Sequence, residues 1–268
     1  EHKVAISRPC ALQSAGMAAE RFFPRFAEPR LKEALADTPV VLLHGPRQCG
    51  KTTLARHLGA KAGYAYKSFD DEVTLAAARS DPIGFVADLP AKCILDEVQR
   101  APGIFRSLKM AVDENRTPGR FLLTGSANVL LVPALSDSLA GRLGIQRLYP
   151  LAQNELANHR PHFLETLFGG RFPAKKRPRL GRELAARIAA GGYPAALARG
   201  SARRRASWYR DYVETMVQRD VRDLARIASL DTLPRLLKLA AGQTAWLINI
   251  SDLGAPLQLS RPTIRDYV

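Results

Sequence analysis

The chain has 268 residues, of which 46% are hydrophobic, so it can bury the core of one or two domains. No apolar run approaches the ~18 residues of a membrane-spanning helix. The three cysteines are too few and too scattered for a disulfide framework or a metal site. The composition therefore argues against a membrane protein or a disulfide-stabilised secreted one, and we expect a cytoplasmic protein. The formal net charge of +15 favours polyanionic partners.

Residues 1–16 lack hydrophobic periodicity and precede Met17. We expect this segment to be a non-native or disordered extension, and we exclude it from the fold prediction. From Met17 onward the pattern predicts a short helix that leads into the first strand. That strand is TPVVLLH, residues 38–44, because a short run of β-branched and aliphatic residues is typical of a buried parallel strand.

A glycine loop follows this strand. The pattern G-x-x-x-x-G-K-[ST] is met by Gly45, Gly50, Lys51 and Thr52, and the next residues, leading to Gly59, have the composition of a helix. A strand, a glycine loop and a helix in this order are the context that a phosphate-binding loop requires. The alternative is an ordinary strand-to-helix turn that happens to hold a lysine, but all four positions and both flanks favour the phosphate loop.

The residue types of the loop fit phosphate chemistry. Its glycines let the backbone approach closely, so that N–H groups at the start of a helix can point at phosphate oxygens. Lys51 would reach the β and γ phosphates, and the Thr52 hydroxyl would ligate Mg²⁺. The expected nucleotide contacts are Gly45, Pro46, Arg47, Gln48, Cys49, Gly50, Lys51, Thr52 and Thr53.

A pair of carboxylates follows another buried strand. After a strand at 64–71 and a helix at 72–82, the run CILDE ends in Asp96 and Glu97. Asp96 can hold Mg²⁺ opposite Thr52, and Glu97 can polarise the attacking water as a general base. Two adjacent carboxylates in a dry site need a cation. The alternative, two solvated carboxylates in a loop, is less favoured because a phosphate loop lies upstream.

Two further candidates concern the γ-phosphate. A strand in GRFLLTGSANVLL ends in polar residues, of which Ser126 is the first choice for a sensor of the γ-phosphate, with Thr124 and Asn128 as alternatives. A helix then leads to Arg142 and to a fifth strand that runs through Tyr149. Arg142 is a candidate cation for the γ-phosphate charge, in its own chain or toward a neighbouring subunit. The alternative for the polar residues after the strand is an ordinary polar turn. The alternative for Arg142 is a surface arginine at a helix end.

The segments GPRQCGKTTL, ILDEVQ, LLTGSAN, LAGR and YPLAQNE together resemble the prokaryotic AAA+-type ATP-binding proteins with a poorly characterised C-terminal domain. The later segments GGYPAAL and YRDYVETMVQRDVRDLARI are similar to the start of that C-terminal region. The resemblance implies an α/β P-loop NTPase core with a parallel central sheet of order 5-1-4-3-2 and helices on both faces. It also implies ATP rather than GTP as the nucleotide.

Cys49 departs from the family's usual loop, which has a small apolar residue at this position. A thiol at a phosphate loop and a helix N-terminus is expected to have a lowered pKa and a raised reactivity, so that nucleotide would protect it from alkylation. The alternative, a buried and inert thiol, is the favoured one of the two.

The C-terminal region is basic and helical. Residues 171–210 hold twelve basic residues and one acidic residue, which predicts a nucleic-acid surface; the alternative is a solvated basic face. An apolar stripe from Trp208 to Ile227 indicates a helix that packs in a core rather than binding a partner. The last 20 residues predict a helix, a short turn and a second helix, with Ser251 and Ser260 as N-caps. This end resembles a partial winged helix, which could bring Arg261, Thr263 and Arg265 to a nucleic-acid groove or serve only for packing.

We therefore expect an ATPase core at residues 17–151 and a basic helical region at residues 152–268 that is truncated inside its last helix. The expected function is Mg²⁺-dependent ATP binding with slow hydrolysis, coupled to DNA, to a protein partner or to further copies of the chain. Two alternatives remain open. One is a nucleotide-gated switch without useful turnover, and the other is a small-molecule kinase, against which the water-activating pair Asp96–Glu97 argues.

Overall fold

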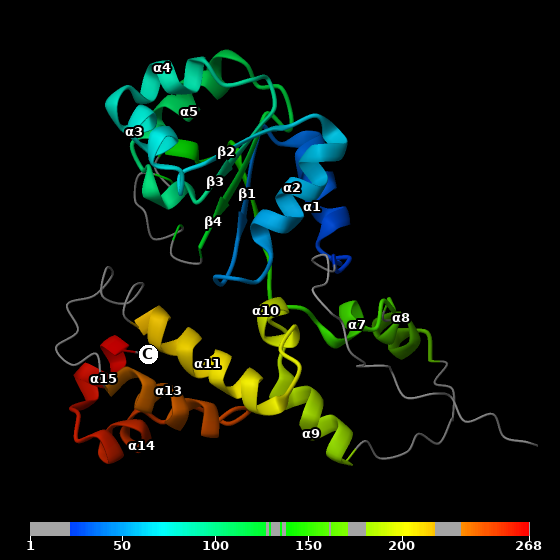
Figure 1. The fold of residues 1–268 in the computed structure, drawn as a ribbon, viewed down its shortest axis with the longest axis vertical. Helices are drawn as coiled ribbons and strands as arrows, with labels where there is room; N and C mark the ends of the chain where they lie inside the picture. The colour runs from blue at the N-terminus through cyan, green and yellow to red at the C-terminus, as the bar shows by residue number, and fades with distance from the viewer. Residues whose placement is uncertain are drawn as a thin grey trace, which may run out of the picture. The chain divides into compact units, whose positions relative to one another are not determined.

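The structure is a computed structural model of the chain, drawn in Figure 1. It describes residues 22–126, 129, 135, 138–160, 162–170, 181–217 and 232–267. The chain divides into two compact units, residues 1–198 and 199–268. The predicted extension at residues 1–16 lies outside the described residues, and the predicted domain boundary after Leu151 stays a prediction.

The first unit is built on a five-stranded parallel sheet of order β2-β3-β4-β1-β5. Read from the other edge, this is the predicted order 5-1-4-3-2, which is confirmed. Strand β1 lies between β4 and β5 and is buried along its whole length, because it has neighbours on both sides and helices on both faces. The strands are β1 Val40–His44, β2 Ala65–Ser68, β3 Cys93–Asp96, β4 Phe121–Gly125 and β5 Leu143–Arg147.

Helices cover both faces of this sheet, as Figure 1 shows. Alternate residues of β1 point to opposite faces: Val40 and Leu42 belong to one apolar cluster, Val41 and Leu43 to another. The first cluster takes in α3, α4 and α5, and the second takes in α1 and α2. The helices of this unit are α1 Glu28–Asp37, α2 Lys51–Ala62, α3 Glu72–Ser80, α4 Pro82–Ala87, η1 Val98–Arg100, α5 Ile104–Glu114, α7 Gln153–Leu156, α8 Phe163–Phe168, α9 Gly181–Ala190 and α10 Pro194–Leu197.

The helix after the glycine loop is longer than its sequence suggests. α2 passes through Gly59 and ends at Gly63, whose φ of 74° is the left-handed conformation of a helix C-cap. Gly59 serves packing instead, because a Cβ there would lie 2.4 Å from Ile94 Cδ1 of β3. The absence of a side chain lets α2, and with it the loop before α2, lie close to the sheet.

The second unit is helical, as predicted, with α11 Ala202–Met216, α13 Leu233–Gly242, α14 Ile250–Gly254, η5 Ala255–Leu257 and α15 Arg261–Tyr267. Leu236, Leu253 and Ile264 form its small core. In α11 the rings of Trp208 and Tyr212 stack with centroids 5.0 Å apart, and the predicted continuation of this stripe over 218–231 lies outside the described residues.

One of the two predicted caps in this unit is confirmed. The Ser260 hydroxyl accepts a hydrogen bond from the Thr263 N–H at 3.3 Å and so begins α15. The prediction for Ser251 is wrong, because the Asn249 side chain accepts from the Ser251 N–H at 3.0 Å and caps α14 two residues earlier. The winged-helix likeness of this end stays a prediction.

Among the described residues, no helix is long and apolar enough to cross a membrane.

Candidate nucleotide-binding site

The glycine loop joins β1 to α2 at the carboxyl edge of the sheet, where ligands bind in open α/β sheets. Its entry is tightly packed: the Leu148 N–H donates to the His44 carbonyl at 2.8 Å, and a Cβ on Gly45 would lie 2.1 Å from the Leu148 carbonyl oxygen. Only glycine fits there. Gln48 (φ 59°) and Gly50 (φ 98°) are left-handed, and alternation of right- and left-handed residues is the backbone pattern that points successive N–H groups at an anion.

Lys51 lies inside this loop and is 4% exposed. Its Nζ donates to the carbonyls of Gly45 at 3.1 Å and Pro46 at 2.9 Å, so the side chain folds back over the loop that it follows. A buried ammonium is costly unless an anion or carbonyl dipoles stabilise it. The position of this cation, beside the N–H groups of the loop, suits the β and γ phosphates of a nucleotide.

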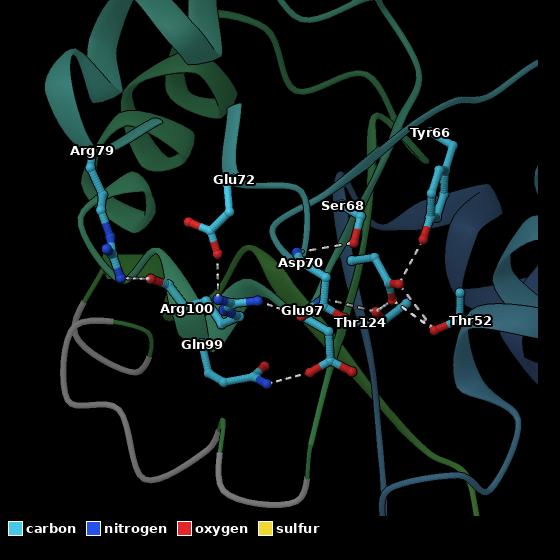
Figure 2. A network of polar contacts seen from close by, with 11 residues as sticks. Thr52, Tyr66, Ser68, Asp70, Glu72, Arg79, Glu97, Gln99, Arg100 and Thr124 are labelled. Carbon is cyan, nitrogen blue, oxygen red and sulfur yellow. Dashed lines mark hydrogen bonds and ion pairs between the residues drawn. The ribbon is translucent and has the colours of Figure 1, made fainter. Parts of the chain in front are cut away.

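Asp96 is the centre of a hydrogen-bond network at the same edge, and Figure 2 shows its partners Thr52, Tyr66 and Thr124. The Thr52 hydroxyl lies 3.0 Å from both carboxylate oxygens, the Tyr66 hydroxyl donates to Oδ2 at 2.7 Å, and the Thr124 hydroxyl donates to Oδ1. The carboxylate is 4% exposed, and three hydroxyl groups satisfy it. Residues 52, 66, 96 and 124, predicted on four separate elements, therefore meet at one point.

The pair of Thr52 and Asp96 has the chemistry of a magnesium site. A hydroxyl and a carboxylate are oxygen ligands, and Mg²⁺ in nucleotide sites is held by one or two protein groups together with phosphates and waters. The described residues contain no cluster of three or more His, Cys, Asp and Glu side chains arranged to hold a metal. A metal at this point would therefore depend on the nucleotide for most of its ligands.

Glu97 points away from its neighbour. Its φ of 58° is left-handed, its N–H donates to Thr124 Oγ1 at 3.3 Å, and its Oε2 accepts from Gln99 Nε2. Figure 2 shows Glu97 turned toward Gln99, and Thr52 on another side of the network. The strained backbone separates the two carboxylates, which allows one to face a metal and the other to face a water. Because Asp96 is buried and bonded, it is not a solvated loop carboxylate.

The two γ-phosphate candidates lie at different edges of the sheet. Ser126 follows β4 directly and is 5% exposed, at the same edge as the loop; Thr124 contacts Asp96, and Asn128 lies outside the described residues. Arg142 precedes β5, whose first residue pairs with Val40, so it lies at the amino edge. A five-residue strand of about 16 Å separates it from the loop.

Arg142 is also engaged by an ion pair. Its Nε and Nη2 lie 2.7 and 3.0 Å from the two carboxylate oxygens of Asp113 on α5, and this guanidinium lowers the pKa of Asp113 below its ordinary value. The structure therefore gives no support to action on the phosphates of its own chain. The alternative, action toward a neighbouring subunit, stays a prediction.

The Cys49 thiol is fully buried, and its Sγ lies 3.5 Å from the Leu148 carbonyl oxygen. Burial raises its pKa above the ordinary value and outweighs the opposite effect of Lys51 and Arg25. The prediction of a lowered pKa and a reactive thiol is wrong. The alternative, a buried inert thiol, agrees with the structure, because the helix N-terminus cannot offset the loss of water around a thiolate.

We expect an alkylating reagent at pH 7–8 to leave Cys49 of the native protein unmodified, whether MgATP is present or absent, and to modify it fully in urea. The reagent reacts with the thiolate, which burial disfavours. Mass spectrometry of the peptide that contains residue 49 measures this. Cys93 is an internal reference, since it is also buried and its pKa is raised to about 11. Rapid native labelling that nucleotide prevents would restore the reactive-thiol interpretation.

Several residues of the site were not among the predicted site residues. Tyr66 lies on the edge strand β2, and burial together with its hydrogen bond to Asp96 raises its pKa to about 12. Gln99 contacts Glu97 from η1. Arg25 and Glu155 form a buried pair 130 residues apart in the chain. Tyr66 and Gln99 could have been predicted as site residues, because each lies on or next to a strand that ends at the site. No local pattern pairs residues 25 and 155.

The parallel sheet of this strand order, with a glycine loop between β1 and α2, is that of a P-loop NTPase domain. In agreement, residues 37–157 match the family model of the AAA domain, and residues 181–268 match that of a domain of unknown function (DUF8612). The predicted family, an AAA-type P-loop core followed by an uncharacterised C-terminal domain, is confirmed.

Two curated relatives are the "uncharacterized" proteins Rv2008c of Mycobacterium tuberculosis and Mb2031c of Mycobacterium bovis. Each is 33% identical over 265 residues, which cover 98% of this chain and 53% of the relative. The chain thus spans about half the length of these relatives.

Solved structures with a similar fold include a Walker-type ATPase of Pyrococcus abyssi, with 17% identity and a TM-score of 0.47 over 92% of this chain and 88% of that chain. Another is the RuvB Holliday junction branch migration motor of Thermotoga maritima, with 18% identity and a TM-score of 0.36 over 89% and 83%. Similarities at this level carry no information about function.

Proposed function

We propose that the chain binds ATP together with Mg²⁺, hydrolyses it slowly, and passes the nucleotide state to a partner through its helical C-terminal region. The observation that carries this proposal is the meeting of Thr52 with Asp96, 3.0 Å from both carboxylate oxygens, directly beside the phosphate loop. Membership of the AAA domain family supports nucleotide binding. Since the chain spans about half of its curated relatives, the partner and the turnover belong to this proposal.

In this mechanism the loop N–H groups and Lys51 hold the β and γ phosphates, and Thr52 and Asp96 would hold Mg²⁺. The metal would supply positive charge that neutralises the phosphates. Glu97 accepts the proton of the attacking water, and Gln99 holds its carboxylate in place. Ser126 senses the γ-phosphate from the end of β4, and Arg142 serves a neighbouring subunit of a homo-oligomer.

Replacement of Thr52 by Ala tests the metal part of the proposal. We expect ATP affinity without Mg²⁺ to stay unchanged, and the gain in affinity that Mg²⁺ gives the wild type to fall about tenfold, because one oxygen ligand is lost. Isothermal titration with ATP in Mg²⁺ and in EDTA measures both quantities. Thr117→Ala, an exposed loop position, is the control. An unchanged response of Thr52→Ala to Mg²⁺ contradicts the assignment, and a wild type that binds no ATP contradicts the function.

DNA is the first candidate for the partner because of the basic segment 171–210. Its described part includes the helix α11, where Arg203, Arg204 and Arg210 are exposed, whereas residues 171–180 lie outside the described residues. Phosphate contacts by such side chains release counterions, so the binding they provide falls steeply with salt. A protein partner is the alternative.

We expect DNA to raise the rate of phosphate release from MgATP at low salt, and added salt to remove the increase. The double variant Arg203→Ala/Arg204→Ala is expected to lose most of the stimulation while it keeps the basal rate, since both side chains lie outside the nucleotide site. The charge-matched control is Arg106→Ala/Arg116→Ala, two exposed arginines near α5. A turnover that ignores DNA would make the basic segment a solvated face and would direct the search to protein partners.

The two alternatives are separated by simple assays. A switch binds MgATP tightly and releases no phosphate, so that a substitution of Glu97 leaves its properties unchanged. A small-molecule kinase moves the γ-phosphate to an added acceptor rather than to water. The position of Glu97 beside the Asp96–Thr52 pair favours transfer to water.

A further inference from the structure

A buried ion pair lies beside the phosphate loop, outside the set of residues proposed to contact the phosphates. Arg25, which precedes α1, and Glu155 of α7 are 7% and 6% exposed, and Arg25 Nε lies 3.2 Å from Glu155 Oε1. Removing a guanidinium and a carboxylate from water is costly unless further hydrogen bonds satisfy both groups. The further hydrogen bonds of Arg25 and Glu155 therefore show which parts of the chain this buried pair holds together.

Arg25 uses its remaining donors on two backbone carbonyls. Nη1 donates to the Cys49 carbonyl at 2.8 Å, and Nη2 donates to the Tyr149 carbonyl at 2.6 Å. The first carbonyl belongs to the peptide that joins Cys49 to Gly50 inside the phosphate loop. In a trans peptide the C=O and the N–H point in opposite directions. Because Arg25 holds the carbonyl on one side, the Gly50 N–H is directed to the other side, which in the proposed function is the side of the phosphates.

Glu155 uses both of its oxygens on the chain around it. Oε1 accepts from the Phe26 N–H at 2.7 Å, and Oε2 accepts from the Ala152 N–H at 2.9 Å, which closes the first turn of α7. The segment 149–155 is thereby attached to the loop through Arg25. The same segment also contacts the residues just before α10, because the Leu151 N–H donates to the Gly192 carbonyl at 2.7 Å.

We propose that Arg25 is a positioning residue for the phosphate loop, and that its ion pair with Glu155 ties the loop to the segment 149–155. This inference rests on the proposed function, ATP binding. Phosphate that binds the Gly50 N–H fixes the Cys49 peptide, and Arg25 transmits this restraint to Tyr149 and Glu155. Nucleotide then stabilises residues 149–155, which connect the sheet to the later part of the chain.

Arg25→Lys tests the proposal because a lysine keeps the charge but has no planar fork that reaches three acceptors. We expect this variant to fold with a lower thermal midpoint, because buried acceptors lose a donor, and to bind MgATP at least about tenfold more weakly at a temperature where it is folded. Glu155→Gln leaves the Arg25 contacts to both carbonyls in place, so we expect it to keep more of the affinity. The matched control is Arg116→Lys, an exposed arginine that pairs with Asp113.

The second readout is amide hydrogen exchange of residues 149–155 in the full chain. MgATP is expected to slow this exchange in the wild type and in Arg116→Lys, and to leave it unchanged in Arg25→Lys and Glu155→Gln. A residue that only stabilises the fold would raise exchange equally with and without nucleotide. If Arg25→Lys does not fold, Glu155→Gln carries the test.

The outcomes separate this inference from the proposed function. Equal MgATP affinity of Arg25→Lys and the wild type overturns the positioning role and leaves ATP binding intact. Wild-type exchange at 149–155 that ignores MgATP overturns the tie to this segment. A wild type that binds no nucleotide overturns both the proposed function and the inference.

Discussion

Glu97→Gln is expected to lower the rate of phosphate release from MgATP by at least about 100-fold, with unchanged nucleotide affinity. A glutamine cannot accept the proton of the attacking water, and general-base catalysis contributes about 10²–10⁴-fold to such a step. Binding is expected to be retained because Glu97 makes its contacts with Gln99 and Thr124, whereas the proposed nucleotide contacts belong to the loop. Phosphate release under single-turnover conditions and a fluorescent-nucleotide titration measure the two quantities.

Lys51→Ala is the companion variant, and it is expected to lose both binding and turnover. Its Nζ is the buried cation of the loop, 3.1 Å from the Gly45 carbonyl. The contrast between the two variants distinguishes catalysis from binding. Turnover that survives Glu97→Gln would contradict the general-base assignment, and it would favour the switch if the wild-type rate is itself negligible.

Phe105→Ala is expected to destabilise the first unit by about 3–5 kcal/mol. Phe105 lies on α5, is fully buried, and belongs to the apolar cluster on one face of the sheet. Its removal loses the burial of a large ring and leaves a cavity that close packing cannot fill. A loss of this size is a large share of the ~5–15 kcal/mol that stabilises a typical domain.

Urea unfolding followed by far-UV circular dichroism measures this loss. Tryptophan fluorescence is unsuitable, because the two tryptophans, Trp208 and Trp246, both lie in the second unit. Met110→Ala is the matched control: the residue is on the same helix, is 52% exposed, and is expected to change stability by about 0.5 kcal/mol or less. Equal effects of the two substitutions would show that α5 does not pack as the structure has it.

The sequence by itself determined the class of fold and the central elements of the site. The phosphate loop and the strands could be predicted because each depends on neighbouring residues, whereas the order of the sheet followed only from the resemblance to a known family. Gly45, Gly50, Lys51 and Thr52 carry the loop through their spacing alone, and Asp96 lies at the strand end that the pattern predicts. Ser260 was recognisable as a cap for the same local reason.

Only the tertiary structure decided which charged groups meet and which are buried. The register of β5 against β1 places Arg142 at the edge of the sheet opposite the loop, although the chain passes close to the site only a few residues later. The position of Cys49 in a packed core, rather than its place before a helix, sets its pKa. The pairing of Arg25 with Glu155 joins residues 130 apart. Desolvation and long-range contacts depend on the whole packed chain, so no local pattern reveals them.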